Sequence, residues 1–149
     1  MIRPGRRLTG ESGFTLVELL VATLIVGALA AVAIPSFLHQ TEKADDAEAK
    51  ALAVSAAKSL EACATSDNGS YAHCTMSSLT AIDPTLQNGA SRMSITAGAN
   101  DYDVVVTAKR GSGAVTYTYS KAANGESERR CATGSQARGG CSATSGGTW

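Results

Sequence analysis

An almost unbroken apolar run over residues 14–38 dominates the polarity pattern, and a short polar segment over residues 1–13 precedes it. About 20 apolar residues are enough for a helix to cross a bilayer, so we expect a transmembrane helix over this run. Arg3, Arg6 and Arg7 lie ahead of it. Because flanking basic residues stay on the cytoplasmic side, the rest of the chain is expected to be exported.

The pattern changes after residue 38, where charged residues are spread among alanines as far as residue 64. Apolar residues recur there at helical spacing and form one stripe. The stripe consists of Ala49, Leu52, Ala53, Ala56, Leu60 and Cys63. We therefore predict that residues 39–64 are the amphipathic half of the same helix and that the stripe packs on a sheet.

Residues 65–149 are predicted to form a small globular domain. A loop with a short helix near residues 76–81 comes first, followed by segments whose alternation and β-branched residues favour strands. The expected strands cover residues 92–97, 102–108 and 115–120, with a fourth short strand near 126–131. Val115, Tyr117 and Tyr119 share one face, which we place against the helix stripe. The predicted fold class is α+β: a long N-terminal helix on an antiparallel sheet of three to four strands.

Composition argues against a nucleic-acid-binding domain. The formal net charge is zero, and there is no basic excess of the kind that such domains carry. Arg129, Arg130 and Arg138 form a small basic cluster that could touch DNA, but clusters of this size are usually solvated. DNA is therefore an unsupported partner.

The four cysteines suggest that the small domain is cross-linked. Four cysteines allow three pairings, and the local one joins Cys63 to Cys74 and Cys131 to Cys141. We expect this pairing; each short loop that it closes would add about 3 kcal/mol of stability in the chain-entropy model. An even cysteine count together with an export segment indicates an oxidising compartment. The other two pairings, and four reduced thiols, are the alternatives.

No catalytic constellation emerges from the sequence. No serine, histidine and acid are grouped in the way nucleophilic catalysis requires, and the four cysteines lack zinc-site spacing. Asp101 and Asp103 are typical of a turn at the start of a strand. Gly111 and Gly113 join two strands and do not open a helix, so they do not resemble a phosphate-binding loop. We predict a protein without enzymatic activity, cofactor or metal.

Two processing sites compete at the N-terminus. A secretory signal would be cut after the small-x-small site that ends at Ala33, which would release a soluble protein beginning at Ile34. The other cut falls between Gly13 and Phe14 and keeps the apolar helix. Glu18 favours the second cut, because a disposable signal gains nothing from a carboxylate in its apolar core.

The segment GFTLVE, residues 13–18, follows a basic leader and opens the apolar run. It resembles the prepilin motif of type IV pilins and pseudopilins. The resemblance implies that a prepilin peptidase cuts after Gly13 and methylates the new amino terminus of Phe14. It also implies that the inner-membrane pilus assembly machinery polymerises this single-pass membrane precursor into an extracellular bacterial filament for adhesion, twitching motility or DNA uptake.

Three residues of the helix have assembly roles in that resemblance. Glu18 of one subunit is expected to neutralise the Phe14 amine of its neighbour in the filament. Pro35 removes a backbone donor, so we predict a kink just before it. The resemblance implies an extensible joint between Gly27 and Pro35, and the alternative is a packing glycine followed by a simple bend.

The nearest rival is a pseudopilin of type II secretion, which shares the N-terminal motif. Major pseudopilins commonly carry a calcium-binding C-terminal loop, and the tail after Cys131 contains no Asp or Glu. The resemblance places the loop between Cys131 and Cys141 on the filament surface. We expect a pilin over a pseudopilin, and over a soluble secreted binding protein released by cleavage after Ala33.

Overall fold

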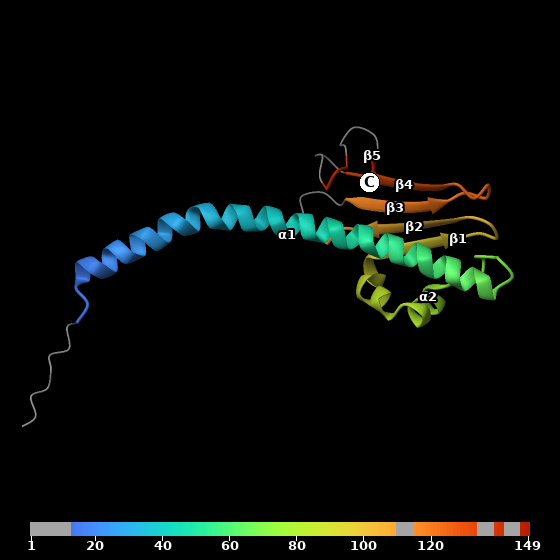
Figure 1. The fold of residues 1–149 in the computed structure, drawn as a ribbon, viewed down its shortest axis with the longest axis horizontal. Coiled ribbons are helices and arrows are strands. Elements are labelled where there is room, and N and C mark those ends of the chain that lie inside the picture. Colours follow the sequence, from blue (N-terminus) through green and yellow to red (C-terminus); the bar gives the residue numbers. More distant parts are fainter. Residues whose placement is uncertain (1–12, 110–114, 134–138, 142–146) are drawn as a thin grey trace, which may run out of the picture. The chain divides into compact units, whose positions relative to one another are not determined.

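The computed structural model describes residues 13–109, 115–133, 139–141 and 147–149 of the chain. The leader apart from Gly13, most of the turn after Lys109, and Arg138 lie outside these ranges. In chain order the elements are α1 (Leu16–Ser66), α2 (Met76–Ile82), the 3-10 helix η1 (Pro84–Arg92), β1 (Met93–Ala97), β2 (Tyr102–Thr107), β3 (Thr116–Lys121), β4 (Ser127–Ala132) and β5 (Gly147–Thr148) (Figure 1).

The chain divides into two compact units, Met1–Leu38 and His39–Trp149, and α1 contributes to both. The described part of the first unit consists of residues 13–15 and the apolar half of α1. Pro35 lies inside α1, and the helix continues on both sides of it. The prediction that one helix runs from the apolar segment into the charged segment is confirmed.

The second unit is built on one antiparallel sheet with the strand order β1-β2-β3-β4-β5. Val106 lies opposite Tyr117, which in turn lies opposite Cys131, so these side chains form a row across three strands. All three are buried, as is Val104 beside them. The alternation along β3 predicted that the face carrying Tyr117 would be buried, and this prediction is confirmed.

The C-terminal part of α1 packs on that face, as Figure 1 shows along the sheet. The predicted stripe is buried from Ala49 to Leu60, and Ala57 and Ala64 extend it. Most of these residues are alanines, which let the helix backbone approach the sheet closely because they have short side chains. Apolar burial at this interface is the main source of stability for the second unit.

The predicted connecting loop contains more structure than its composition indicated. The short helix near residues 76–81 is present as α2, and Thr75 caps it by accepting a hydrogen bond from the Ser78 amide. Asp83 ends α2 and also caps η1, where its side chain accepts from the Thr85 amide. The 3-10 helix η1 was not predicted, because its sequence has no helical apolar period.

The sheet has five strands in the part of the chain that the structure describes, one more than the upper end of the expected three to four. The fourth predicted strand is present as β4. The fifth strand, β5, pairs Gly147 with Cys131 and Thr148 with Arg130. Gly147 and Thr148 are too few to show the alternation of apolar and polar residues that marks a strand. Their strand conformation depends on pairing with β4.

The structure joins the cysteines in the local pairing. The S–S distance is 2.03 Å for Cys63–Cys74 and 2.17 Å for Cys131–Cys141. The first bridge ties the end of α1 to the segment before α2. The second ties β4 to the segment that leads to β5.

Candidate functional site

The start of α1 has a defined local geometry. Gly13, Phe14 and Thr15 precede the helix and are not helical. The Thr15 carbonyl accepts a hydrogen bond from the Leu19 amide at 3.2 Å, and the Thr15 hydroxyl oxygen accepts one from the Glu18 amide at 3.2 Å. The bond between Gly13 and Phe14 therefore lies outside the helix, and Glu18 lies in its first turn.

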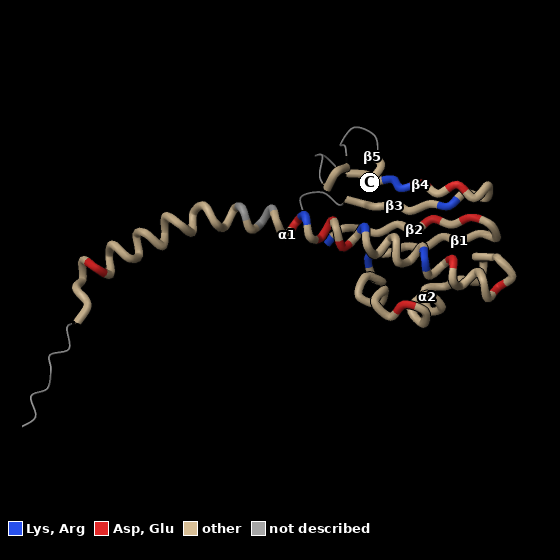
Figure 2. Tube along the Cα trace, viewed as in Figure 1, with Lys and Arg blue, Asp and Glu red and all other residues tan. Residues whose placement is uncertain are grey.

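The apolar half of α1 exposes large side chains around its whole circumference. Together with Phe14 just before the helix, its exposed large hydrophobic residues are Leu16, Val17, Leu19, Leu20, Val21, Leu24, Ile25, Val26, Leu29, Val32, Ile34 and Phe37. By length and composition, α1 is able to cross a membrane. Figure 2 shows the contrast between this half, where Glu18 is the charged residue, and the charged half that follows. A surface of this kind requires lipid or other protein to cover it.

The family model for the prokaryotic N-terminal methylation motif matches residues 8–34. The chain carries the class III signal peptide of type IV pilins and pseudopilins. This prepilin motif contains Gly13, Phe14, Glu18 and Gly27, and it ends one residue before Pro35. No curated protein and no solved structure matches the chain significantly.

The prepilin motif and the exposed apolar helix both fit a membrane-anchored precursor that is processed before assembly. The motif implies processing by a prepilin peptidase and entry into a pilus-type assembly machinery. The apolar helix fits a precursor anchored in the membrane. The motif is that of structural subunits of the pilin type.

Beyond the motif, α1 carries a carboxylate that joins three parts of the second unit. Glu61 accepts hydrogen bonds from Tyr71 at 2.8 Å, from Tyr102 at 3.1 Å and from the Lys121 ammonium at 2.8 Å. Burial alone would raise the pKa of Glu61, but these three donors outweigh it and lower the pKa below its ordinary value of 4.5. Burial and the Glu61 carboxylate together strongly raise the pKa of Tyr102.

A second carboxylate of α1 holds the other end of the sheet. Glu48 accepts from Arg92 at 2.7 Å and from Lys109 at 2.9 Å. Arg92 also donates to the Thr107 carbonyl at 3.1 Å. The hydrogen bond from Lys109 and the charge of Arg92 lower the pKa of Glu48, although partial burial opposes them. The two carboxylates thus fix α1 to the sheet at positions 13 residues apart (61 − 48).

Gly139, which lies between the second pair of cysteines, is held against α1. Lys50 donates to the Gly139 carbonyl at 2.5 Å, and its ammonium lies 5.2 Å from the centre of the Tyr117 ring. Gly139 has φ +60°, and a Cβ built on it would lie 2.7 Å from a carboxylate oxygen of the buried Asp46. The close approach at Gly139 leaves no space for a side chain.

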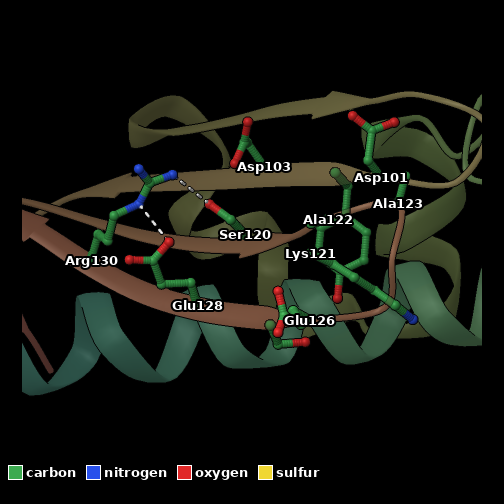
Figure 3. Close-up of a pocket in the computed structure, with 11 residues that line it drawn as sticks. Asp101, Asp103, Ser120, Lys121, Ala122, Ala123, Glu126, Glu128 and Arg130 are labelled. Carbon is green, nitrogen blue, oxygen red and sulfur yellow. Dashed lines mark hydrogen bonds and ion pairs between the residues drawn. The ribbon is translucent and has the colours of Figure 1, made fainter.

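A shallow hollow of about 640 Å³ lies where β2 begins and the β3–β4 hairpin turns (Figure 3). Its lining includes Asp101, Asp103, Glu126 and Glu128. Figure 3 shows Arg130 reaching Ser120 and Glu128, with distances of 3.3 Å and 3.5 Å respectively. Among the residues that the structure describes, no group of three His, Cys, Asp or Glu side chains is placed to hold a metal ion.

Two arginines of the predicted basic cluster have partners within the domain. Arg129 lies 5.6 Å from the Tyr119 ring centre and 5.4 Å from that of Trp149. Arg130 is paired as described above. Trp149 in turn donates to the Arg130 carbonyl at 2.8 Å. Both guanidinium groups therefore have contacts within the domain, and these contacts add no support for DNA as a partner.

Sequence reasoning missed three sets of contacts. The role of Thr15 could have been found, because Thr15 and Glu18 have the Thr-x-x-Glu spacing of a helix capping box. The Glu61 contacts could not, because Lys121 lies 60 residues away in sequence. The contact between Lys50 and Gly139 spans 89 residues and was equally hidden.

Proposed function

We propose that this chain is the structural subunit of a type IV pilus. A prepilin peptidase cuts between Gly13 and Phe14 and methylates the Phe14 amine. The processed subunit is drawn from the cytoplasmic membrane into an extracellular filament. Partners are other copies of the chain, the peptidase and the assembly machinery of the inner membrane.

One observation carries the proposal: the motif and the exposed apolar helix coincide in the same segment. The match over residues 8–34 includes the scissile bond, and the apolar side chains that follow it have no cover within the described chain. A single subunit can cover this surface with lipid, and a filament can cover it with neighbouring helices. The proposed cut before the helix would leave this surface on the processed subunit, where it is available for packing in a polymer.

Glu18 supplies the polar element of this assembly. A charge inside an apolar environment is costly unless it is paired. In the proposed filament, the Phe14 amine of a neighbouring subunit pairs with the Glu18 carboxylate. A misplaced subunit would leave a buried charge unpaired, so this contact specifies register more than it adds stability. In the same proposal, the segment between Gly27 and Pro35 is the extensible joint.

A pseudopilin of type II secretion is the second candidate, because it carries the same motif. The tail after Cys131 contains no acidic residue, and this favours the pilus over a pseudopilin with a calcium-binding tail. A soluble protein cut after Ala33 is the third candidate. That site lies within α1, where the backbone is helical, whereas the bond after Gly13 lies in non-helical backbone. The geometry supports the earlier cut.

Electron microscopy of the surface of the producing cells tests the proposal. Cells that express the chain should carry filaments whose subunit mass is that of the processed, methylated protein beginning at Phe14. Glu18→Gln should leave membrane insertion intact and remove the filaments, since it deletes the charge and keeps the side-chain shape. Glu126→Gln is the matched control, because Glu126 is exposed and bonds to the nearby Asn124. Normal filaments from the Glu18→Gln variant would contradict the proposed role of Glu18.

A further inference from the structure

The junction of α2 and η1 exposes a large apolar side chain of the second unit. Ile82 is 48% exposed, and Ala81 and Pro84 beside it are also exposed. Asp83 lies between Ile82 and Pro84, and one of its carboxylate oxygens caps η1. Among the described residues, no cation forms an ion pair with this carboxylate. Residues 81–84 are called the Ile82 surface below: an apolar patch with one negative charge.

A guanidinium group in contact with two aromatic rings lies at the other edge of the sheet. Arg129 is exposed, and its guanidinium carbon lies 5.6 Å from the Tyr119 ring centre and 5.4 Å from that of Trp149. Trp149 is held in turn by its hydrogen bond to the Arg130 carbonyl and by edge-on contact with the Tyr117 ring at 5.9 Å. In the described part of the chain no carboxylate pairs with Arg129. Tyr119, Arg129 and Trp149 are called the Arg129 surface: an aromatic patch with one positive charge.

The two surfaces are complementary in both polarity and charge. They also lie on opposite edges of the sheet, since Figure 1 shows α2 beside β1 and β5 beside β4. We propose that the Ile82 surface of one copy binds the Arg129 surface of the next copy, an inference that rests on the pilus function proposed above. Ile82 packs on the aromatic rings, and the Asp83 carboxylate pairs with the Arg129 guanidinium across the contact.

A contact of this kind suits a filament because it joins unlike surfaces of two copies. Each added copy leaves one surface of each kind free, so the contact repeats and gives an open helical array where the rotation does not close a ring. Tyr, Trp and Arg are enriched among the residues that dominate binding energy at interfaces. Arg129 is already held against its two rings, so it loses less conformational freedom on binding. The second units thereby add a lateral contact to the packing of the apolar helices.

Cross-linking of isolated filaments tests the contact. The four native cysteines are closed in disulfides, so a thiol added to each surface is the group that a short bismaleimide labels. Ala81→Cys adjoins Ile82, and Ser127→Cys lies on the same face of β4 as Arg129; both positions are exposed. Filaments of the full-length double variant should give a ladder of cross-linked copies on a denaturing gel. Each single variant should stay monomeric, because the contact joins unlike surfaces.

The matched control combines Thr96→Cys with Ser127→Cys. Thr96 is exposed and alternates with the partly buried Ile95 and Ala97, which places it on the outer face of β1. We expect no ladder from this pair. Monomers from the Ala81→Cys and Ser127→Cys filaments, or an equal ladder from the control, would overturn the contact. If the natural protein forms no filaments, the proposed function itself fails, and the contact that rests on it fails with it.

Removal of the two charges gives a second measurement that needs no cross-linker. Asp83→Asn deletes the charge and keeps an oxygen to cap η1, and Arg129→Gln leaves both aromatic rings in place. Each change should lower the filament yield and leave the unfolding midpoint of the full-length protein unchanged. The double variant should lose no more than either single variant, because both changes remove the same pair. An undiminished yield, or a loss that only accompanies a lowered unfolding midpoint, would overturn the pairing of Asp83 with Arg129.

Discussion

The Glu61 carboxylate of α1 and the Lys121 ammonium of β3 lie 2.8 Å apart, although 60 residues separate them in sequence. Tyr71 joins the pair from the segment after α1, since its hydroxyl donates to Glu61 and accepts from Lys121 at 2.7 Å. Tyr102 adds a further donor from β2. One carboxylate therefore connects the helix, the loop closed by the first disulfide, and two strands.

Replacing Glu61 should weaken the second unit. Glu61→Gln leaves Lys121 without its counter-ion and removes the charge from three hydrogen bonds. We expect a loss of about 1–2 kcal/mol in the free energy of unfolding, which is reduced by solvent screening because the Glu61 side chain is 45% exposed. Guanidinium unfolding of the full-length protein in detergent, followed by Trp149 fluorescence, measures the change. An unaltered midpoint would show that this cluster adds nothing to stability.

Acid should destabilise the second unit through Glu48 and Glu61. Both carboxyls have pKa values below 4.5 in the folded protein. Their contribution is therefore fully present above the unfolded value and is lost as the pH falls through the folded values. The free energy of unfolding should be steady near neutral pH and should decline from about pH 5 downward. Unfolding curves at a series of pH values provide the measurement.

A double variant, Glu48→Gln with Glu61→Gln, tests whether these two carboxylates cause the pH dependence. That variant should be less stable at neutral pH and should lose less of its remaining stability in acid. Glu126→Gln on the exposed β3–β4 hairpin should keep the acid dependence of the natural protein. If the double variant declines as steeply as the natural protein, other carboxylates are responsible.

Gly139 and Gly140 form a matched pair for testing how the tail docks on α1. Both have positive φ, +60° and +83°, so alanine at either position carries a similar backbone penalty. A Cβ at Gly139 would also collide with the Tyr117 hydroxyl and the Asp46 carboxylate, whereas one at Gly140 would lie 3.7 Å from Lys50. Gly139→Ala should be the more destabilising by about 1–3 kcal/mol, as measured by guanidinium unfolding. Equal effects would mean that the tail does not pack closely at Gly139.

Much of the architecture was predictable because it depends on local periodicity. The helical stripe ending near Cys63 and the alternation of Val115, Tyr117 and Tyr119 were enough to predict a helix on a sheet. The β5 strand was not predictable, because Gly147 and Thr148 have no β-type pattern of their own and depend on β4 for their pairing. Periodicity describes which face of an element is apolar, but it contains no information about which distant element covers it.

In the candidate site, too, some features could be predicted from the sequence and others could not. Glu18 stands out in the sequence because it is a charge in an apolar run, and its spacing from Gly13 carries the prepilin resemblance. The contacts of Glu61 and Lys50 do not stand out, because acidic and basic residues are common along an exposed helix. Their partners become visible when the fold brings Lys121 and Gly139 beside α1.

The mass of the intact exported protein tests the central claim most directly, because it identifies the first residue. We predict a chain that begins at Phe14 and carries one added methyl group, with both disulfides closed. Substituting Gly13 should leave the unprocessed precursor in the membrane. A protein that begins at Ile34 and carries no methyl group would contradict retention of the apolar helix, and with it the filament.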